Sequence, residues 1–414
     1  MSISKKKEKL WTIRDSEILR ALGNEAYYRS RLDEALEYFK KALEIDEELK
    51  NIKGMATDLN SIGSVYWIWG RHEKMLEYHE KALKFAQKIG DRINEGIAVG
   101  SLGSAYSDLG DVKKAIEYYE KALRIAQEIG DKRNEGIWLG SLGSAYSDLG
   151  EARKAIGYYE KALWIAHEIG DTVNEGTSLG NIGNAYRDLG DVRKAIEYYE
   201  KALWISQKIG DRGNEGMWLG SLGNACHVLG DVRKAIGYYE KALRIAQEIG
   251  DKKNEGASLG NLGSAYRDLG EARKAIEYSE KALRIAQETG DKRNEGKWFG
   301  NLGNAYSDLG DAGKTIEFYE KALKIIQDTG DRRSEGTLQN NLGATFEEEN
   351  RYKEAVACFL LAQEIHTQTE NPELKTTESN LRKLEEKLGR KKFEMLLAEA
   401  APRAEEIVQR KGIL

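Results

Sequence analysis

A few segments of the sequence place reactive side chains close together, and each fails as a catalytic motif. The segment 310–315 (GDAGKT) ends like a phosphate-binding loop, but that motif requires a glycine five residues before Gly313, where the sequence has Asp308. His72 and His79 are seven residues apart and have no cysteine or third ligand nearby, so they predict no zinc site. Paired acidic residues are common, but they recur along the chain as surface charges.

The cysteines add no reactive group. Cys226 precedes His227, but consecutive residues of a helix point in different directions, so a cysteine–histidine nucleophile is not expected. Cys226 and Cys358 are too few for a disulfide framework and are typical of a reducing compartment. From these residues we predict a protein that is not an enzyme and that binds no metal and no cofactor.

The composition excludes other classes of function. The 414 residues include 64 Lys and Arg against 69 Asp and Glu, so the chain lacks the strongly basic surface of nucleic-acid-binding proteins. No apolar run approaches the roughly 18 residues that a membrane-spanning helix needs. The N-terminus, MSISKKKEKLWTIRDSEIL, has no apolar segment and no cleavage site of a secretory signal. We therefore expect a cytoplasmic protein without nucleic-acid or membrane partners.

One 40-residue segment recurs through most of the chain. The copy that begins at Ser101 reads SLGSAYSDLGDVKKAIEYYEKALRIAQEIGDKRNEGIWLG. The aliphatic residue before the first glycine of each copy, called here the marker residue, recurs at Leu22, Ile62, Leu102, Leu142, Ile182, Leu222, Leu262, Leu302 and Leu342. A fixed period of this length indicates a stacked repeat architecture, here of nine units.

Each repeat predicts two helices, A and B. In the third repeat Gly110-Asp111 and Gly130-Asp131 separate them, since glycine can end one helix in the left-handed conformation and aspartate can cap the next. Apolar residues recur between these pairs with the helical period: Val99, Leu102, Tyr106 and Leu109 in helix A, and Val112, Ala115, Ile116, Tyr119, Ala122, Leu123 and Ala126 in helix B. Strand signals are absent, so the fold class is all-α.

The shared residues resemble the tetratricopeptide repeat (TPR). In the third repeat the signature positions are Leu102, Gly103, Tyr106, Gly110, Ala115, Tyr119 and Ala122. The 40-residue form is similar to Pins/LGN-type spindle adaptors and kinesin light chains. The resemblance implies an α-solenoid, a right-handed superhelix of antiparallel helix pairs whose A helices line a concave surface. We expect a basic segment at 1–14, nine repeats at 15–370 and a helical cap or tail at 371–414.

Glycine and small polar residues dominate the predicted concave face. Glycine stands two positions before the marker residue from Gly100 to Gly300, and serine or asparagine stands one before and two after it. Glycine costs a helix about 1 kcal/mol relative to alanine, so this face gives up intrinsic stability. Carboxamides carry a donor and an acceptor and can bind an extended peptide backbone. The predicted peptide-binding residues are Asn181, Asn184, Asn224, Asn261, Asn301, Asn304 and Asn341.

Two features of this face have an alternative explanation. The glycines can serve packing, because A helices crowd together on the inside of a curved stack. Five positions after the marker residue, Arg187, His227 and Arg267 stand on successive A helices and can bind an acidic segment or a C-terminal carboxylate. The alternative for these three is a salt bridge to the aspartate row beside them, which includes Asp188 and Asp268.

Tryptophans and the C-terminal tail add further surfaces. Trp138, Trp218 and Trp298 recur in every second repeat beside the core and predict packing. Trp164 and Trp204 occupy the exposed face of helix B, where they form an interface for a partner or a second copy, or are isolated surface residues. The tail's apolar stripe either caps the ninth repeat or docks a partner; it comprises Leu381, Leu384, Leu388, Phe393, Leu396 and Leu397.

These patterns predict a scaffold or adaptor that binds an extended or acidic peptide segment of another protein in the concave groove. The alternative is a sensor or regulatory subunit of a separately encoded effector enzyme. That subunit would dock through the C-terminal tail or the convex face.

Overall fold

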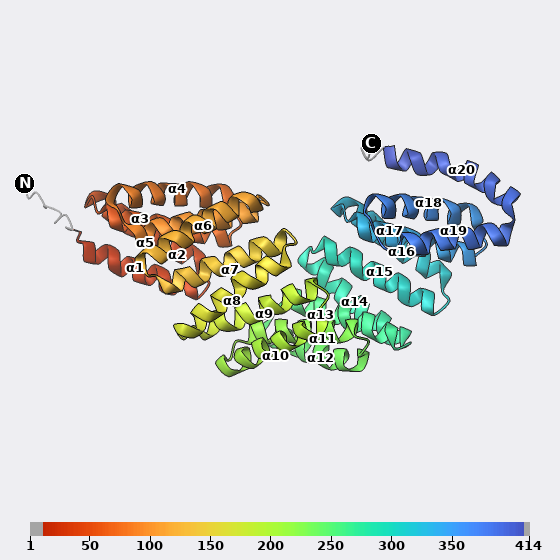
Figure 1. Ribbon diagram of the computed structural model, residues 1–414, viewed down its shortest axis with the longest axis horizontal. Coiled ribbons are helices and arrows are strands. Elements are labelled where there is room, and N and C mark those ends of the chain that lie inside the picture. Colours follow the sequence, from red (N-terminus) through yellow and green to blue (C-terminus); the bar gives the residue numbers. More distant parts are fainter. Residues whose placement is uncertain (1–10, 410–414) are drawn as a thin grey trace, which may run out of the picture. The chain divides into compact units, whose positions relative to one another are not determined.

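The computed structural model describes the backbone of residues 11–409 and the side chains of residues 11–400. Within this part the chain forms twenty α-helices and no strand, as the all-α prediction requires (Figure 1). The first ten are α1 (Ile13–Tyr28), α2 (Leu32–Glu48), α3 (Ile52–Ile68), α4 (His72–Ile89), α5 (Arg92–Asp108), α6 (Val112–Ile129), α7 (Lys132–Asp148), α8 (Ala152–Glu168), α9 (Thr172–Asp188) and α10 (Val192–Ile209). The other ten are α11 (Arg212–Val228), α12 (Val232–Ile249), α13 (Lys252–Asp268), α14 (Ala272–Thr289), α15 (Lys292–Asp308), α16 (Ala312–Thr329), α17 (Arg332–Glu348), α18 (Tyr352–Gln368), α19 (Leu374–Leu388) and α20 (Arg390–Gln409).

Glycine–aspartate pairs end and restart the helices as predicted. Gly110 adopts φ +80°, which a residue with a Cβ rarely adopts, and the side chain of Asp111 accepts a hydrogen bond from the backbone N–H of Lys114 at 3.1 Å. The same cap begins α16, where Asp311 accepts from the backbone of Lys314. The segment that ends like a phosphate-binding loop is therefore an ordinary start of a B helix.

Each A–B pair shares a core. In the third repeat Leu102, Ala115, Tyr119 and Ala122 are all buried, and the ring of Tyr119 lies directly over Gly103. Burying a side chain of leucine size contributes about 1.5–3 kcal/mol, so repeated pairs of this kind stabilise the stack. Leu109, which the helical period assigns to the apolar face of helix A, does not join this core. Leu109 is the C-cap of α5 and is 53% exposed, because the chain has already turned away from the core at this residue.

The chain divides into two compact units, residues 1–210 and 211–414. The first unit contains repeats one to five (α1–α10), and the second contains repeats six to nine and the tail (α11–α20). Each helix packs against the next in sequence within its unit, and most A helices also contact the A helix of the next repeat. The A–B frame is therefore the same in both units.

The tail packs on the ninth repeat. Both α19 and α20 contact α18. Leu384, Phe393 and Leu396 are buried in the same hydrophobic cluster as the α18 residues Val356 and Phe359. These contacts favour the capping explanation of the apolar stripe over a free docking helix.

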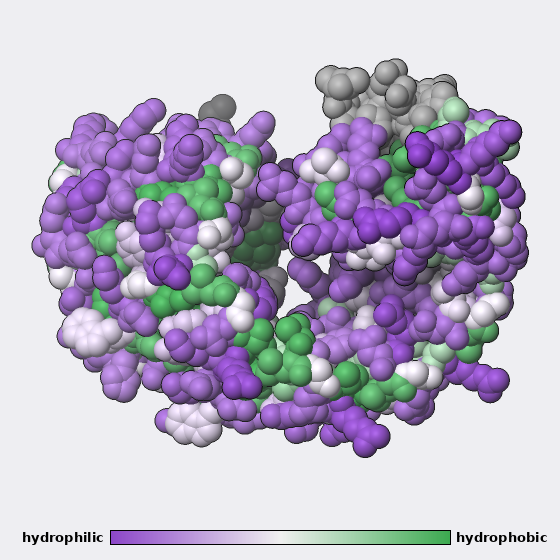
Figure 2. All heavy atoms as spheres, turned by 45° about the vertical axis from the view of Figure 1, so that its right-hand side comes forward, coloured by the Kyte–Doolittle hydropathy of each residue, from purple (hydrophilic) through white to green (hydrophobic). Residues whose placement is uncertain are grey.

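Hydrophilic residues cover most of the face drawn in Figure 2, and hydrophobic residues form scattered patches on it. None of the helices formed by the described residues combines the length and apolar composition needed to cross a bilayer.

Candidate functional site

Several predicted peptide-binding residues line hollows within the two units. In the second unit, a hollow of about 840 Å³ is lined by Asn301, Asn304 and Asn341 among others. A neighbouring hollow of about 500 Å³ shares Asn304 and Asn341 and adds Arg267. In the first unit, Asn181 lines a pocket of about 210 Å³. The remaining predicted residues stand at equivalent positions of their A helices but line none of these three hollows.

The position two after the marker residue binds the hydroxyl of a core tyrosine. Tyr319 donates to Oδ1 of Asn304 at 2.6 Å, and a serine does the same in the third repeat, where Tyr119 donates to Ser104 at 3.2 Å. Burial raises the pKa of Tyr199 to about 12, so its hydroxyl stays a donor. Three more pairs repeat the contact: Tyr159–Ser144, Tyr199–Asn184 and Tyr239–Asn224. This row therefore serves the core, a role that helix propensity does not reveal.

Asparagines one before the marker residue bind the preceding repeat. Asn341 donates its amide to Oδ1 of Asn304 at 3.4 Å. Asn301 donates to Ser264 at 3.0 Å in the same way. A third bond, at 3.1 Å, runs from Asn261 to Asn224. Asn181 has no such partner in the described part of the chain. The asparagine rows thus form a ladder between successive A helices.

These bonds use only half of each bonded carboxamide, and the carboxamide of Asn181 uses neither half. Two after the marker residue, the amide nitrogens bind no acceptor within residues 11–400; these belong to Asn184, Asn224 and Asn304. One before the marker residue, the carbonyl oxygens receive no donor in the same part of the chain; these belong to Asn181, Asn261, Asn301 and Asn341. The asparagines are half-buried or exposed, so donors from one row and acceptors from the next remain available on the surface.

The three predicted cations are all paired with aspartates of the adjacent row. The pairs are Arg187–Asp188 at 2.9 Å, His227–Asp268 at 2.7 Å and Arg267–Asp308 at 3.7 Å. These contacts are the alternative explanation given above. A ligand carboxylate at any of them would compete with an aspartate.

Lys297 is a groove cation that sequence reasoning missed. It lines the hollow of about 840 Å³, five positions before the marker residue of the eighth repeat. Its ammonium lies 4.7 Å from the ring centroid of Trp298, and no carboxylate pairs with it in the described residues. Desolvation by the walls of the hollow, and secondarily Arg293, lowers its pKa. A comparison of this position across repeats would have found it, since the middle repeats have Ile137, Thr177, Met217 and Ala257 there.

The glycine row has several environments, which the sequence pattern did not separate; a Cβ on Gly300, for example, would make an ordinary contact with Leu338. A Cβ on Gly100 would overlap the indole of Trp138 from the next repeat, and Gly260 faces Trp298 in the same way. All three recurring tryptophans, Trp138, Trp218 and Trp298, are buried as predicted. The packing explanation is thus confirmed at Gly100 and Gly260, where the neighbour is a side chain rather than a backbone.

The packing explanation is wrong for Gly140 and Gly220. Outside each glycine's own helix, no atom of the described residues lies within 4 Å of a Cβ placed there. The reason is the residue at the tryptophan position of the next repeat, which is Ser178 opposite Gly140 and Ser258 opposite Gly220.

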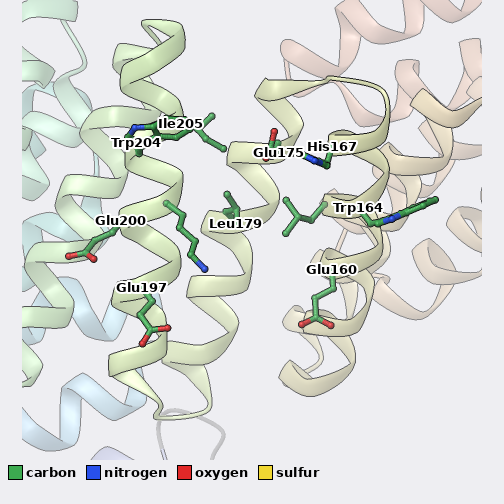
Figure 3. A pocket seen from close by; sticks show the side chains of 11 residues that line it. Glu160, Trp164, His167, Glu175, Leu179, Glu197, Glu200, Trp204 and Ile205 are labelled. Carbon is green, nitrogen blue, oxygen red and sulfur yellow. Dashed lines mark ion pairs between the residues drawn. The ribbon is translucent and has the colours of Figure 1, made fainter.

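The tryptophans of the B helices line a large pocket of the first unit. Trp164 of α8 and Trp204 of α10 are each 61% exposed. Their pocket has a volume of about 950 Å³, and Figure 3 shows Leu179 of α9 between the two helices. The indole of Trp164 points away from Leu179 in this view. Leu163 and Ile205 complete the apolar lining, and four acidic residues line the pocket too: Glu160, Glu175, Glu197 and Glu200.

The described residues contain no group of three or more histidine, cysteine or carboxylate side chains placed to hold a metal ion. His79 is buried, and its Nδ1 lies 3.0 Å from Oδ1 of Asn60. Cys226 is buried at the position of the core Tyr106, as expected. His227, next to it in sequence, binds Asp268 instead.

A family model described as tetratricopeptide repeat matches residues 54–128, 95–168, 134–208, 214–288 and 294–368, and a second of the same description matches residues 16–49. No curated protein matches the sequence. The fold resembles a signal transduction ATPase with numerous domains and a tetratricopeptide repeat sensor, from Pyrococcus horikoshii (TM-score 0.67, 20% identity, 89% of this chain and 56% of that chain covered). The chain thus spans little more than half of that protein.

Two further structures are similar. One is the apo form of the quorum sensor NprR from B. thuringiensis (TM-score 0.60, 18% identity, 82% of this chain and 99% of that chain). The other is a Rap protein complexed with competence and sporulation factor (TM-score 0.58, 16% identity, 85% and 98%). At these identities the likeness shows the fold alone, whereas the family models match most of the sequence. The chain belongs to the tetratricopeptide repeat family.

Proposed function

We propose that this protein is a non-enzymatic scaffold or adaptor that binds an extended peptide segment of another protein along its A helices. The supporting observation is the half-used asparagine ladder. One row presents unpaired amide donors and the next presents unpaired carbonyl acceptors, in hollows of about 840 and 500 Å³. A peptide backbone offers the complementary groups at every residue.

The energetics favour a segment over a single contact. One hydrogen bond contributes about 1 kcal/mol net, so useful affinity requires several in series. The repeat supplies such a series, because the same positions recur on each A helix. The similar Rap structure was solved with competence and sporulation factor bound, which agrees with a ligand-binding role for this fold.

The charge of the groove favours an acidic residue in the peptide. Lys297 is exposed to the hollow and lacks a carboxylate partner in the described chain, whereas Arg187, His227 and Arg267 already have aspartates. A carboxylate beside Lys297 would stabilise the charged ammonium, which desolvation disfavours. We therefore place the acidic contact of the proposed peptide at Lys297.

A selection experiment tests the proposal. Random linear peptides displayed on phage are selected against the full chain, and the affinities of enriched peptides are measured for the wild type and for the variant Asn261→Ser/Asn301→Ser/Asn304→Ser/Asn341→Ser. Serine occurs naturally at both positions in other repeats, where Ser104 still accepts from its tyrosine. At about 1 kcal/mol per lost bond, affinity should fall at least about tenfold.

The single variants Asn304→Ser and Asn304→Ala separate binding from folding. Both remove the amide donor, but only alanine leaves the Tyr319 hydroxyl without its acceptor, at a cost of about 1–3 kcal/mol in stability. Equal affinity of enriched peptides for the wild type and the fourfold serine variant would overturn the proposed groove.

The pocket of Trp164 and Trp204 favours a second candidate function, a sensor or regulatory subunit that docks an effector through its B helices. The tail is the weaker docking element, because its apolar stripe packs on the ninth repeat. The variant Trp164→Ala/Trp204→Ala distinguishes the two functions. It should leave peptide affinity unchanged if the peptide lies on the A helices, and should abolish binding if the B helices hold the partner.

A further inference from the structure

The pocket of about 210 Å³ in the first unit has the walls of a site that holds a tryptophan in the preceding repeat. We call such a site a seat, filled when a tryptophan of the next repeat occupies it and vacated when none does. In the repeat before it, the indole of Trp138 packs over Gly100 in a cluster with Tyr119, Ala122, Ile125 and Ala126. The pocket is lined by the residues 40 positions later: Gly140, Tyr159, Ala162, Ile165 and Ala166. The walls are therefore the same, and only the indole is missing, because Ser178 stands at the position of Trp138.

The same pattern occurs in the second unit. Gly220 faces open space, and Ser258 stands at the position that Trp298 occupies one repeat later. Trp298 itself fills its seat completely, since it is 1% exposed and lies over Gly260. Within each unit, a filled seat and a vacated seat thus lie on successive A helices, according to whether the next repeat has tryptophan or serine at this position.

We infer that the vacated seats bind aromatic side chains, tryptophan best, of the peptide in the A-helix groove. This inference rests on the proposed function and names the anchor residues of its ligand. The chain's own indole shows which group these walls fit. The size also agrees, since a pocket of about 210 Å³ is smaller than the ~300–1,000 Å³ of sites that enclose a whole small molecule, and suits one side chain.

The rim of the first seat suits the backbone that carries such a ring. Asn181 lines this pocket and has no hydrogen-bond partner in the described chain, unlike Asn261, Asn301 and Asn341. Its carboxamide can bind the peptide unit next to the inserted ring. An aromatic anchor in a desolvated pocket beside polar contacts is the usual arrangement of a binding hot spot.

Methyl NMR of the full chain, labelled at isoleucine and alanine methyls, tests the seat directly. The probe is N-acetyl-L-tryptophanamide, and the control is N-acetyl-L-leucinamide. The tryptophan probe should produce ring-current shifts at Ile165, Ala162 and Ala166, and the leucine control should not. The methyls of Ile125 and Ala122 are an internal control, because Trp138 fills their seat.

Two variants should exchange the responses of the filled and the vacated seat to the tryptophan probe. Ser178→Trp fills the first seat with the residue used in the neighbouring repeat, so the Ile165 shifts should appear without probe and no longer respond to it. Trp138→Ser vacates the filled seat, so Ile125 and Ala122 should begin to respond; this variant keeps the test decisive if Ser178→Trp does not fold. Equal responses of Ile125 and Ile165 in the wild type, or none at Ile165, would overturn the inference.

Peptides separate this inference from the proposed function. Enriched peptides should contain an aromatic residue whose replacement by leucine lowers affinity at least tenfold, and Ser178→Trp or Ser258→Trp should lower it similarly. Peptides that bind through the asparagines but are indifferent to both changes would refute the seats alone. Failure to enrich any peptide would refute the proposed function, while the NMR experiment still decides whether the seats bind the aromatic probe.

Discussion

The second repeat and the middle repeats place different chemistry on the same 40-residue frame. In the middle repeats a core tyrosine occupies the B helix, and glycine and small polar residues occupy the A helix. In the second repeat His79 replaces that tyrosine, Asn60 replaces the glycine two before the marker residue, and Asp58 stands where Trp138 stands two repeats later. All three of these polar side chains are buried.

These buried groups bond to one another or to neighbouring repeats. Oδ1 of Asn60 accepts a hydrogen bond from Nδ1 of His79 at 3.0 Å, and its amide nitrogen donates to the backbone carbonyl of Asn94 at 3.3 Å. Arg20 of α1 bridges Asp58 at 2.6 Å and Asp46 at 2.5 Å, and both carboxylates are fully buried. The buried polar side chains of the second repeat are thus bonded to the protein, with Oδ2 of Asp58 and Nε2 of His79 left without a partner in the described chain, whereas the bonded asparagines of the later repeats keep half of each carboxamide on the surface. The same frame thus carries a buried polar cluster in the second repeat and half-bonded asparagines in the later repeats, where we propose that the peptide binds.

The largest expected effect comes from removing the buried salt bridges of Arg20. Arg20→Ala leaves two buried carboxylates without their shared cation and should destabilise α1–α3 by about 3–5 kcal/mol at pH 8. Hydrogen–deuterium exchange of these helices measures the local stability. Arg29→Ala is the matched control, because its pair with Glu25 is exposed and contributes about 0–1 kcal/mol. Equal exchange in the two variants would contradict the bridging role of Arg20.

The second prediction is that the stability of α3–α4 depends on pH through His79. Burial lowers the pKa of His79 to about 4, below its ordinary 6.5, so the unfolded chain takes up the proton first. The stability that neutral His79 gives is present above pH 6.5 and is lost as the pH falls toward 4, by up to about 3 kcal/mol. His79→Tyr should remove this loss, and its hydroxyl would meet Ser64 as Tyr119 meets Ser104.

Protonation of Asp58 changes the stability of the folded state in the opposite direction from protonation of His79. Burial raises the pKa of Asp58 to about 7, so the folded state takes up this proton first and gains stability as the pH falls from 7 toward 4. In His79→Tyr only this contribution remains, and α3–α4 should be more stable at pH 5 than at pH 7 by hydrogen exchange corrected for intrinsic rates. An unchanged pH dependence in the variant would show that His79 is not the titrating group.

The smallest effect compares a filled seat with a vacated one. Gly100→Ala forces a methyl against the indole of Trp138 and should cost about 1–3 kcal/mol. Gly140→Ala meets open space and should stabilise its helix by about 0.5–1 kcal/mol. Thermal or urea unfolding of the two variants gives the comparison. The account of the glycine row fails if both substitutions have the same sign.

The repeat period, the helix ends and the buried tryptophans could be predicted because each depends on residues close in sequence. Gly110 and Asp111, for example, determine a local cap. The hydrogen-bond partners of the polar residues could not be predicted in this way. The Tyr319–Asn304 bond joins two helices, and the vacancy at Gly140 depends on Ser178 in the following repeat. Such properties follow from packing between elements, which a single helical wheel does not contain.

Photo-crosslinking tests the central claim most directly. Benzoylphenylalanine is placed in separate variants at Ser307, which lines the hollow of about 500 Å³, and at Trp204 on the B helices, and each is irradiated with an enriched peptide. The account predicts crosslinks at Ser307 that excess unlabelled peptide suppresses, and none at Trp204. Crosslinks at Trp204 with none at Ser307 would contradict it.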